Sequence, residues 1–314
     1  MQENTAKKMK TVKSLGDWAT LGIAKHFEKI VKYEQDVLAD REIEDLHQMR
    51  VGMRRLRSTM TSLGLALDLP KAAREQKVGK IARILGTLRD LDVLGQVLTT
   101  EYQPHLPKSE AQILAEVIEV LTTQRQEAFK KVKECLHDRL YLNFKQDLNT
   151  WLENPIYQPI GQILLSTVLP DLLLPQASRL LLHPGWLVGI DCQKTDIETL
   201  LQKQGIVLHE LRKEAKRSRY NMELFTEFYG DIYQTYLRDI KEIQTVLGEI
   251  QDGFILAKFL ATVRGKNWKA TMPTLVQKFQ DIRALKWQEW QPLQDKFLQP
   301  QNRKEFHLSI LNCS

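Results

Sequence analysis

The chain is poor in the residues that build disulfide frameworks and zinc sites. Its three cysteines, Cys135, Cys192 and Cys313, lie far apart in 314 residues, and no CxxC pair occurs. Such spacing argues against a zinc site and against a disulfide framework, and it fits a reducing compartment. We therefore expect a cytoplasmic protein that uses no metal ion and no cofactor.

Long hydrophobic runs are also absent. Residues 1–13 are polar and lysine-rich and lack the apolar core of a signal peptide, so a flexible tail is expected there. The most apolar stretch, residues 163–182, is interrupted by Pro170, Asp171 and Pro175. This pattern favours a buried helix hairpin over a membrane span, and no membrane partner is expected.

Glycine and proline are modest in number, at 15 and 11, whereas hydrophobic residues make up 43% and charged residues 27%. This composition is typical of a globular helical protein. Apolar periodicity predicts an all-α fold, with helices over about 15–40, 43–68, 72–103, 195–228, 231–264 and 272–298, and one long or two shorter helices over 109–152. The net charge of +6 does not by itself identify a partner.

Two motifs recur with one ungapped offset of 162 positions (209 − 47 and 247 − 85). The segment His47 to Met60 matches His209 to Met222, and Leu85 to Leu94 matches Leu247 to Leu256. Agreement of two separate motifs predicts an internal duplication and a pseudo-two-fold molecule. We expect a first helical-bundle half over 14–153, a proline-punctuated connection over 154–194 and a second half over 195–314.

Four basic residues of the first motif lie at positions i, i+3, i+7 and i+10: His47, Arg50, Arg54 and Arg57. At 3.6 residues per turn they fall within roughly a quarter of the helix circumference. An apolar face adjoins them, formed by Leu46, Met49, Met53, Leu56, Met60, Leu63 and Leu67. The duplicate repeats the arrangement with His209, Arg212, Lys216 and Arg219. Each helix should pack on a core and hold a row of cations beside it.

A charged helix face is usually only solvated, but two observations favour an anion site here. The segment from His47 to Arg57 holds four arginines and no carboxylate, so no partner one turn away relieves their repulsion. The same row recurs in the duplicate. Guanidinium groups match phosphate oxygens bidentately, and cations one or two turns apart suit a chain of phosphates. Two rows facing each other would form a basic central pore or groove.

The histidine that begins each row, His47 or His209, has no second ligand at a metal-binding spacing. We expect both to donate hydrogen bonds to phosphate and to act as weak pH sensors. In the second motif, Gly86 and Gly248 are expected to allow close helix packing.

Asp90 and Asp252 stand at matched positions of the second motif, in a Leu-Gly-x-x-x-Asp frame. A metal site would need further carboxylates, but the counterpart of Asp92 is Phe254. We therefore favour a structural role, in which each Asp pairs with arginines of the row and sets their conformation.

These motifs together resemble the CHAD family, the conserved histidine α-helical domain. The resemblance is carried in order by His47 to Arg57, Leu85 to Leu94 and Leu208 to Glu223, and it covers about residues 15–300. It implies two helical bundles around a basic central pore and binding of inorganic polyphosphate, often at polyphosphate granules. By position, the phosphate contacts would be the eight row residues. Secondary candidates are Arg55, Arg217, Lys213, Arg83, Arg125, Lys133 and Arg139.

Two other functions remain as alternatives. A phosphohydrolase or phosphotransferase would need a positioned nucleophile and usually Mg²⁺, but the sequence has no P-loop, no HExxH motif and no clustered carboxylates. A scaffold for nucleic acid or an acidic protein is also conceivable. Single-strand binders stack bases on aromatic side chains, however, and only Tyr220 lies within a row. The oligomeric state and the preferred polyphosphate length are not given by the sequence.

Overall fold

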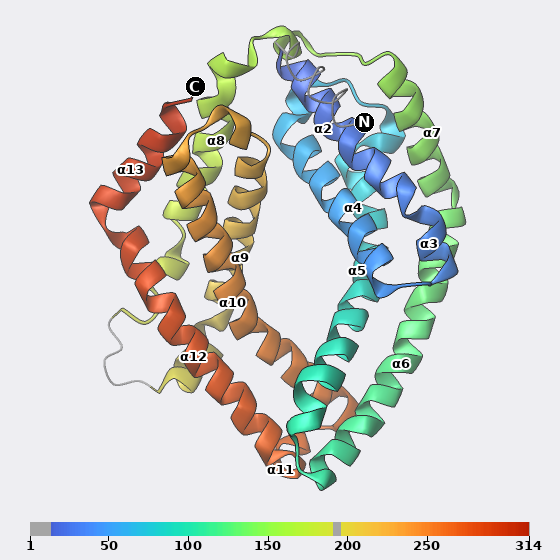
Figure 1. Cartoon of the computed structure of the whole chain (residues 1–314), viewed down its shortest axis with the longest axis vertical. Coiled ribbons are helices and arrows are strands. Elements are labelled where there is room, and N and C mark those ends of the chain that lie inside the picture. Colours follow the sequence, from blue (N-terminus) through green and yellow to red (C-terminus); the bar gives the residue numbers. More distant parts are fainter. Residues whose placement is uncertain (1–13, 191–195, 314) are drawn as a thin grey trace. The chain divides into compact units, whose positions relative to one another are not determined.

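The structure is a computed structural model that describes residues 14–190 and 196–313 (Figure 1). The predicted flexible tail, residues 1–13, lies outside the described residues. In the described part all regular elements are helical, which confirms the all-α prediction. The α-helices are α2 (Leu15–Lys32), α3 (Glu34–Ala39), α4 (Ile43–Leu63), α5 (Glu75–Val97), α6 (Lys108–His137), α7 (Arg139–Glu153), α8 (Leu165–Leu181), α9 (Ile197–Glu223), α10 (Asp231–Arg264), α11 (Trp268–Thr271), α12 (Pro273–Leu298) and α13 (Pro300–Leu311).

The chain divides into two compact units. The first unit comprises the chain up to Val93 together with Thr123–Leu169, and the second comprises Leu94–Thr122 together with Pro170–Ser314. The predicted halves, 14–153 and 195–314, follow the order of the chain. The units differ from them chiefly because the segment Leu94–Thr122 packs with the second unit.

The first unit is built around close packing of α2 against α4. The N-terminus of α2 is held by a capping box, in which Ser14 and Asp17 each accept a hydrogen bond from the other's backbone N–H. A Cβ atom on Gly52 of α4 would lie 3.2 Å from the carbonyl oxygen of His26, and one on Gly22 of α2 would lie 3.2 Å from the side chain of Thr59. Glycine therefore lets the two helices approach closely at two points.

A buried carboxylate ties α3 to α7 within the first unit. Glu34 is 7% exposed, accepts a hydrogen bond from the hydroxyl of Tyr141 at 2.8 Å and pairs with Lys145 at 2.8 Å. The indole nitrogen of Trp151 donates to the carbonyl oxygen of Asp68 at 2.9 Å. Because the Glu34 charge is both paired and hydrogen-bonded, its burial is tolerated, and α7 is held in place.

The second unit has an aromatic core between η6 (Pro184–Leu187) and α12. The ring of Trp186 stacks on Trp290 and Phe297, with ring centroids 5.3 and 5.1 Å apart. The amide of Gln294 donates to the carbonyl oxygens of Trp186 and Val188 at 2.7 and 2.9 Å. These contacts fix the segment before α9, and α9 in turn packs against α10.

The first turn of α6 belongs to the second unit, where Glu110 caps α12. Its carboxylate accepts hydrogen bonds from the backbone N–H groups of Thr274 and Leu275, both at 3.0 Å. Glu110 is only 4% exposed, and the positive end of the α12 dipole stabilises its charge. This contact joins segments 164 residues apart in sequence.

The prediction of a helix hairpin over 163–182 is wrong. The structure has one helix there, α8, with Pro170 and Pro175 inside it. Leu169 and Leu173 are 0% and 2% exposed, one turn apart on a single buried face. The prolines each remove one backbone donor, but the continuous apolar face keeps the segment helical. The boundary between the two units falls directly before Pro170.

Candidate functional site

The first row, defined as His47, Arg50, Arg54 and Arg57, lies along the edge of the buried face of α4. The predicted core residues Met49, Met53 and Leu56 are at most 1% exposed. All four members of the first row are half-buried. The cations are therefore held beside the core rather than on a fully solvated face.

The second row, defined as His209, Arg212, Lys216 and Arg219, has the same setting on α9. Leu208, Leu211 and Ala215 are at most 2% exposed, and all four members of the row are half-buried. In each unit the helical period thus places an identical type of row at the margin of an apolar face.

A glycine of the neighbouring helix lies against the guanidinium of Arg50. A Cβ atom on Gly86 of α5 would lie 2.5 Å from Arg50 Nη1, which is closer than real atoms approach. One turn further along α5, Asp90 Oδ1 lies 3.7 Å from Arg50 Nη2. Asp90 thus has the arginine neighbour that the sequence analysis expected, although its side chain is 78% exposed.

The second unit repeats this contact at positions offset by the same 162 residues. A Cβ atom on Gly248 of α10 would lie 2.9 Å from Arg212 Nε, which also donates to the carbonyl oxygen of Gln244 at 3.2 Å. Asp252 remains exposed and forms no ion pair within the described part of the chain. Partial desolvation raises its pKa, and the charge of Arg212 opposes that rise.

These glycines have a more specific role than general helix packing. Any larger residue at Gly86 or Gly248 would displace the guanidinium of Arg50 or Arg212. The contact occurs in both units although the partner carboxylates differ. The glycines thus leave room for the guanidinium of the second member of each row.

The last member of each row already has a carboxylate partner. In the first row, Arg57 binds Glu75 of α5 through Nε at 2.9 Å and Nη2 at 2.6 Å. In the second row, Arg219 Nε lies 3.3 Å from Glu223 Oε1, and the guanidinium lies 4.6 Å from the ring centroid of Tyr220. A bound anion would have to share these arginines.

Both histidines have a pKa below the usual value of 6.5. For His47 the cause is first burial and then the positive charges of Arg89, Arg54 and Arg50, against the opposing charge of Glu44. For His209 it is first burial and then the charges of the neighbouring arginine and lysines. Nδ1 of His209 is buried and has no hydrogen-bond partner among the described residues. Burial and neighbouring cations therefore favour the neutral form of each histidine, and an anion nearby would favour the protonated form.

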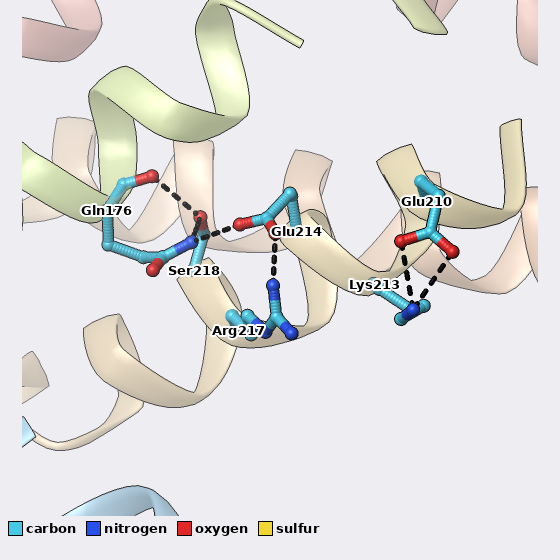
Figure 2. A network of polar contacts seen from close by, with 6 residues as sticks. All are labelled: Gln176, Glu210, Lys213, Glu214, Arg217 and Ser218. Carbon is cyan, nitrogen blue, oxygen red and sulfur yellow. Dashed lines mark hydrogen bonds and ion pairs between the residues drawn. The ribbon is translucent and has the colours of Figure 1, made fainter. Parts of the chain in front are cut away.

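The second row carries acids of its own helix (Figure 2). Lys213 pairs with Glu210 at 2.9 Å, and Arg217 pairs with Glu214. Figure 2 shows Glu214 pointing also to Gln176 of α8, whose amide donates to it at 2.9 Å. The two secondary candidates on α9 are therefore neutralised locally, in contrast to α4, where no acid lies between His47 and Arg57.

Arg125, another secondary candidate, is held by two internal carboxylates. Its Nε donates to Asp92 at 3.0 Å, and its terminal nitrogens bond Asp40. The side chain of Asp92 is 1% exposed, and burial raises its pKa while Arg125 opposes that rise. Arg125 thus joins α3, α5 and α6 within the first unit and is less available to a ligand than the members of the first row.

The other secondary candidates have no described contact with a row. Arg83 Nε donates to the carbonyl oxygen of Gly79 at 3.2 Å. Lys133 and Arg139 are exposed, and Lys133 lies 5.3 Å from the ring centroid of Phe129. Arg55 lies instead on the α2 side of α4, where its charge lowers the pKa of His26 after the larger effect of burial.

The structure also places two further basic groups beside the first row that the sequence analysis did not assign to it. Arg89 of α5 lies close enough to His47 to lower its pKa. Lys29 of α2 lies close to Arg55 and Arg54. The signal for Lys29 was present in the sequence, as lysines at positions 25, 29 and 32 share one helix face.

Within residues 14–190 and 196–313, no three histidine, cysteine or acidic side chains are grouped so that they could hold a metal ion. In the same part of the chain, no helix is both long and apolar enough to cross a membrane.

Comparisons with known proteins agree with this arrangement. The family model of the CHAD domain matches residues 22–261. The CHAD domain from the plant Ricinus communis is 20% identical, with 96% of this chain and 95% of that chain covered and a TM-score of 0.63. PptA from Streptomyces chartreusis is 13% identical, with 89% and 100% covered and a TM-score of 0.65. At these identities the likeness to either structure shows the fold alone. No curated protein matches the chain in sequence.

Proposed function

Because the chain belongs to the CHAD domain family, we propose that it binds inorganic polyphosphate without cleaving it, through the first and second rows. The family is known for polyphosphate-related proteins. The observation that carries the proposal is the pair of half-buried cationic rows, each with its second member, an arginine, lying over a glycine of the next helix.

The chemistry of the rows suits a phosphate polymer. Successive members lie three or four residues apart, which is about 5 Å along a helix axis, so neighbouring cations can bind neighbouring phosphates. Arginine stays charged at any physiological pH and offers two parallel donors to one phosphate. Partial burial strengthens each contact because the surrounding medium is less polar than water. That the two rows line one shared pore stays a prediction.

Simple binding is favoured over catalysis by how the nearby carboxylates are used. Glu75, Glu210 and Glu214 each pair with a cation of the same unit. Phosphoryl transfer needs a positioned nucleophile and usually carboxylates that hold Mg²⁺. Acids that neutralise arginines and lysines are less available for that task.

The test is a salt-titrated binding assay with polyphosphates of several chain lengths. Binding should weaken linearly on a logarithmic salt scale, with a steeper slope for longer chains until all row cations are occupied. Affinity that is independent of salt and of chain length would contradict the proposal.

Two controls separate the alternative functions. Incubation with Mg²⁺ should leave the length distribution of the polyphosphate unchanged, and shortening of the chains would show an enzyme instead. Polyphosphate should also displace single-stranded nucleic acid at physiological salt. Displacement in the opposite direction would favour a nucleic-acid scaffold.

A further inference from the structure

Three lysines share one face of α2 in the first unit. Lys25, Lys29 and Lys32 lie at positions i, i+4 and i+7, roughly within 60° of one another around the helix. Lys25 and Lys32 are exposed, whereas Lys29 is half-buried. This face is separate from the buried face of α2 that packs on α4.

Close packing brings one residue of this face, Lys29, beside cations of α4. Gly52 of α4 lies against Ile30 of α2, the residue next to Lys29. A Cβ atom on Gly52 would lie 3.0 Å from the side chain of Ile30. Burial lowers the pKa of Lys29, and the charges of Arg55, Lys32 and Arg54 lower it further, whereas Glu44 opposes them. Lys29 therefore lies within electrostatic reach of two α4 arginines.

The lysines have few acidic neighbours to offset this repulsion. Among the described residues, neither Lys25 nor Lys29 forms an ion pair with a carboxylate. Lys32 lies 5.3 Å from the ring centroid of Tyr33. Crowded like charges destabilise a helix pair unless an anion neutralises them.

The offset of 162 residues gives no counterpart of these lysines. It places Leu187 at the position of Lys25, but Leu187 belongs to the short helix η6 and is 64% exposed. The helix of the second unit that binds α9 is α8, through Gln176 and Glu214, and its last turn carries Arg179.

We propose that Lys25 and Lys29 of α2 bind the same phosphate chain as the first row, so that the site of the first unit spans two helices. This inference rests on the proposed function. It adds two cations of α2 to the four of the first row, with Glu28 and Glu44 as the nearby acids. The lysines would contact phosphates that the α4 arginines leave exposed.

The experiment compares two double variants of equal charge in the salt-titrated assay with long-chain polyphosphate. Lys25→Gln with Lys29→Gln should reduce the slope of log K against log salt by about 1.4, at roughly 0.7 for each lost contact with a flexible polyanion. The control, Lys130→Gln with Lys131→Gln on α6 of the same unit, should change the slope by less than half as much. Equal slopes for the two variants would overturn the inference.

Further variants distinguish failure of this inference from failure of the proposed function. Lys25→Arg with Lys29→Arg keeps both charges and should retain the wild-type slope, which shows that charge rather than fold is responsible. If wild type binds and Arg50→Ala with Arg54→Ala abolishes binding, but the lysine variant binds as wild type does, only the α2 extension is wrong. Wild type without salt-dependent binding would overturn both.

Discussion

The first and second rows have the same spacing, the same burial and the same glycine contact, yet they differ in charge. On α4 no acid lies within the row, and the partners Glu75 and Asp90 come from α5. On α9 the acids Glu210 and Glu214 lie within the row's own helix and pair with its flanking cations. The two rows thus share their geometry but differ in their electrostatic surroundings.

The helices that follow the two rows, α5 and α10, also differ in how they contact an arginine. In the first unit Asp92 of α5 forms an ion pair with Arg125. Phe254 of α10 replaces Asp92 at the matched position, and the guanidinium of Arg283 lies 4.7 Å from its ring centroid. Arg283 instead pairs with Glu198 through two bonds of 2.8 Å. An ion pair in one unit is therefore exchanged for a cation–π contact in the other.

The largest expected effect comes from removing the central arginines of one row at a time. Arg50→Ala with Arg54→Ala should weaken polyphosphate binding by at least about 100-fold, since each charged hydrogen bond contributes roughly 1.5–3 kcal/mol. Arg212→Ala with Arg219→Ala should weaken it by only about tenfold, because Arg219 is already paired with Glu223. The measurement is affinity at one fixed salt concentration, with circular dichroism to check helicity. Equal losses would show that the two rows contribute alike.

Local pattern was enough to predict most of the fold. The apolar period placed α4, α5, α9, α10 and α12 within a few residues of their observed bounds. The helix predicted over 15–40 is divided at Tyr33. The segment 109–152, predicted as one long or two shorter helices, is divided at Asp138, whose side chain accepts a hydrogen bond from the backbone of Leu140 and starts α7. Local breaks of this kind decide where a helix begins or ends, but they leave the period of the apolar residues unchanged.

The candidate site was harder to predict from the sequence than the fold. Carboxylates distant in sequence decide which cations remain available to a ligand. Nothing near Arg125 in sequence indicates that Asp40, 85 residues away, binds it. The role of Gly86 likewise depends on how the α5 backbone meets Arg50, which follows from packing alone. By contrast, Glu210 and Glu214 stand three residues before Lys213 and Arg217, a spacing that favours local ion pairs, although both cations are predicted above as secondary phosphate contacts.

The next effect in size tests whether glycine positions the row arginines. Gly86→Ala should lower polyphosphate affinity by about tenfold, because its Cβ atom displaces Arg50 from its position and one charged contact is lost. Gly248→Ala should act in the same direction but less strongly, since its clearance of 2.9 Å is larger. Affinity and salt slope are the measurements.

The matched control is Gly205→Ala on α9, where no atom lies within 4 Å of the added Cβ. It should leave binding unchanged and stabilise the helix by up to about 1 kcal/mol, measured by thermal unfolding. Adding Arg50→Lys to Gly86→Ala should restore part of the affinity, because a lysine lacks the wide guanidinium. Wild-type binding by Gly86→Ala alone would show that the glycine serves only helix packing.

A smaller effect should follow from making the second row resemble the first. Glu210→Gln with Glu214→Gln keeps the size of both side chains and removes the charges that neutralise Lys213 and Arg217. The salt slope should steepen by about 0.7 for each cation that becomes available to the phosphate chain. Glu242→Gln with Glu227→Gln, on other elements of the second unit, controls for net charge. A slope no steeper than that of this control would mean that Lys213 and Arg217 do not contact the ligand.

The smallest effect concerns the histidines, which are the feature that the two units share most closely. Both have a pKa lowered first by burial and then by neighbouring cations, so the free protein favours the neutral form of both rings. A bound phosphate raises the pKa of each ring. Affinity should therefore increase as the pH falls from the bound-state pKa toward the free-state pKa, and level off below it. If the bound-state pKa lies one unit above the free-state pKa, the full increase in affinity is about tenfold per histidine. If the units are equivalent in this respect, His47→Gln and His209→Gln should each remove half of the pH dependence, measured at constant ionic strength. A loss of pH dependence in His47→Gln alone would show that the two units also differ in the protonation of their histidines. A wild-type pH dependence in the double variant would exclude both histidines from the phosphate site.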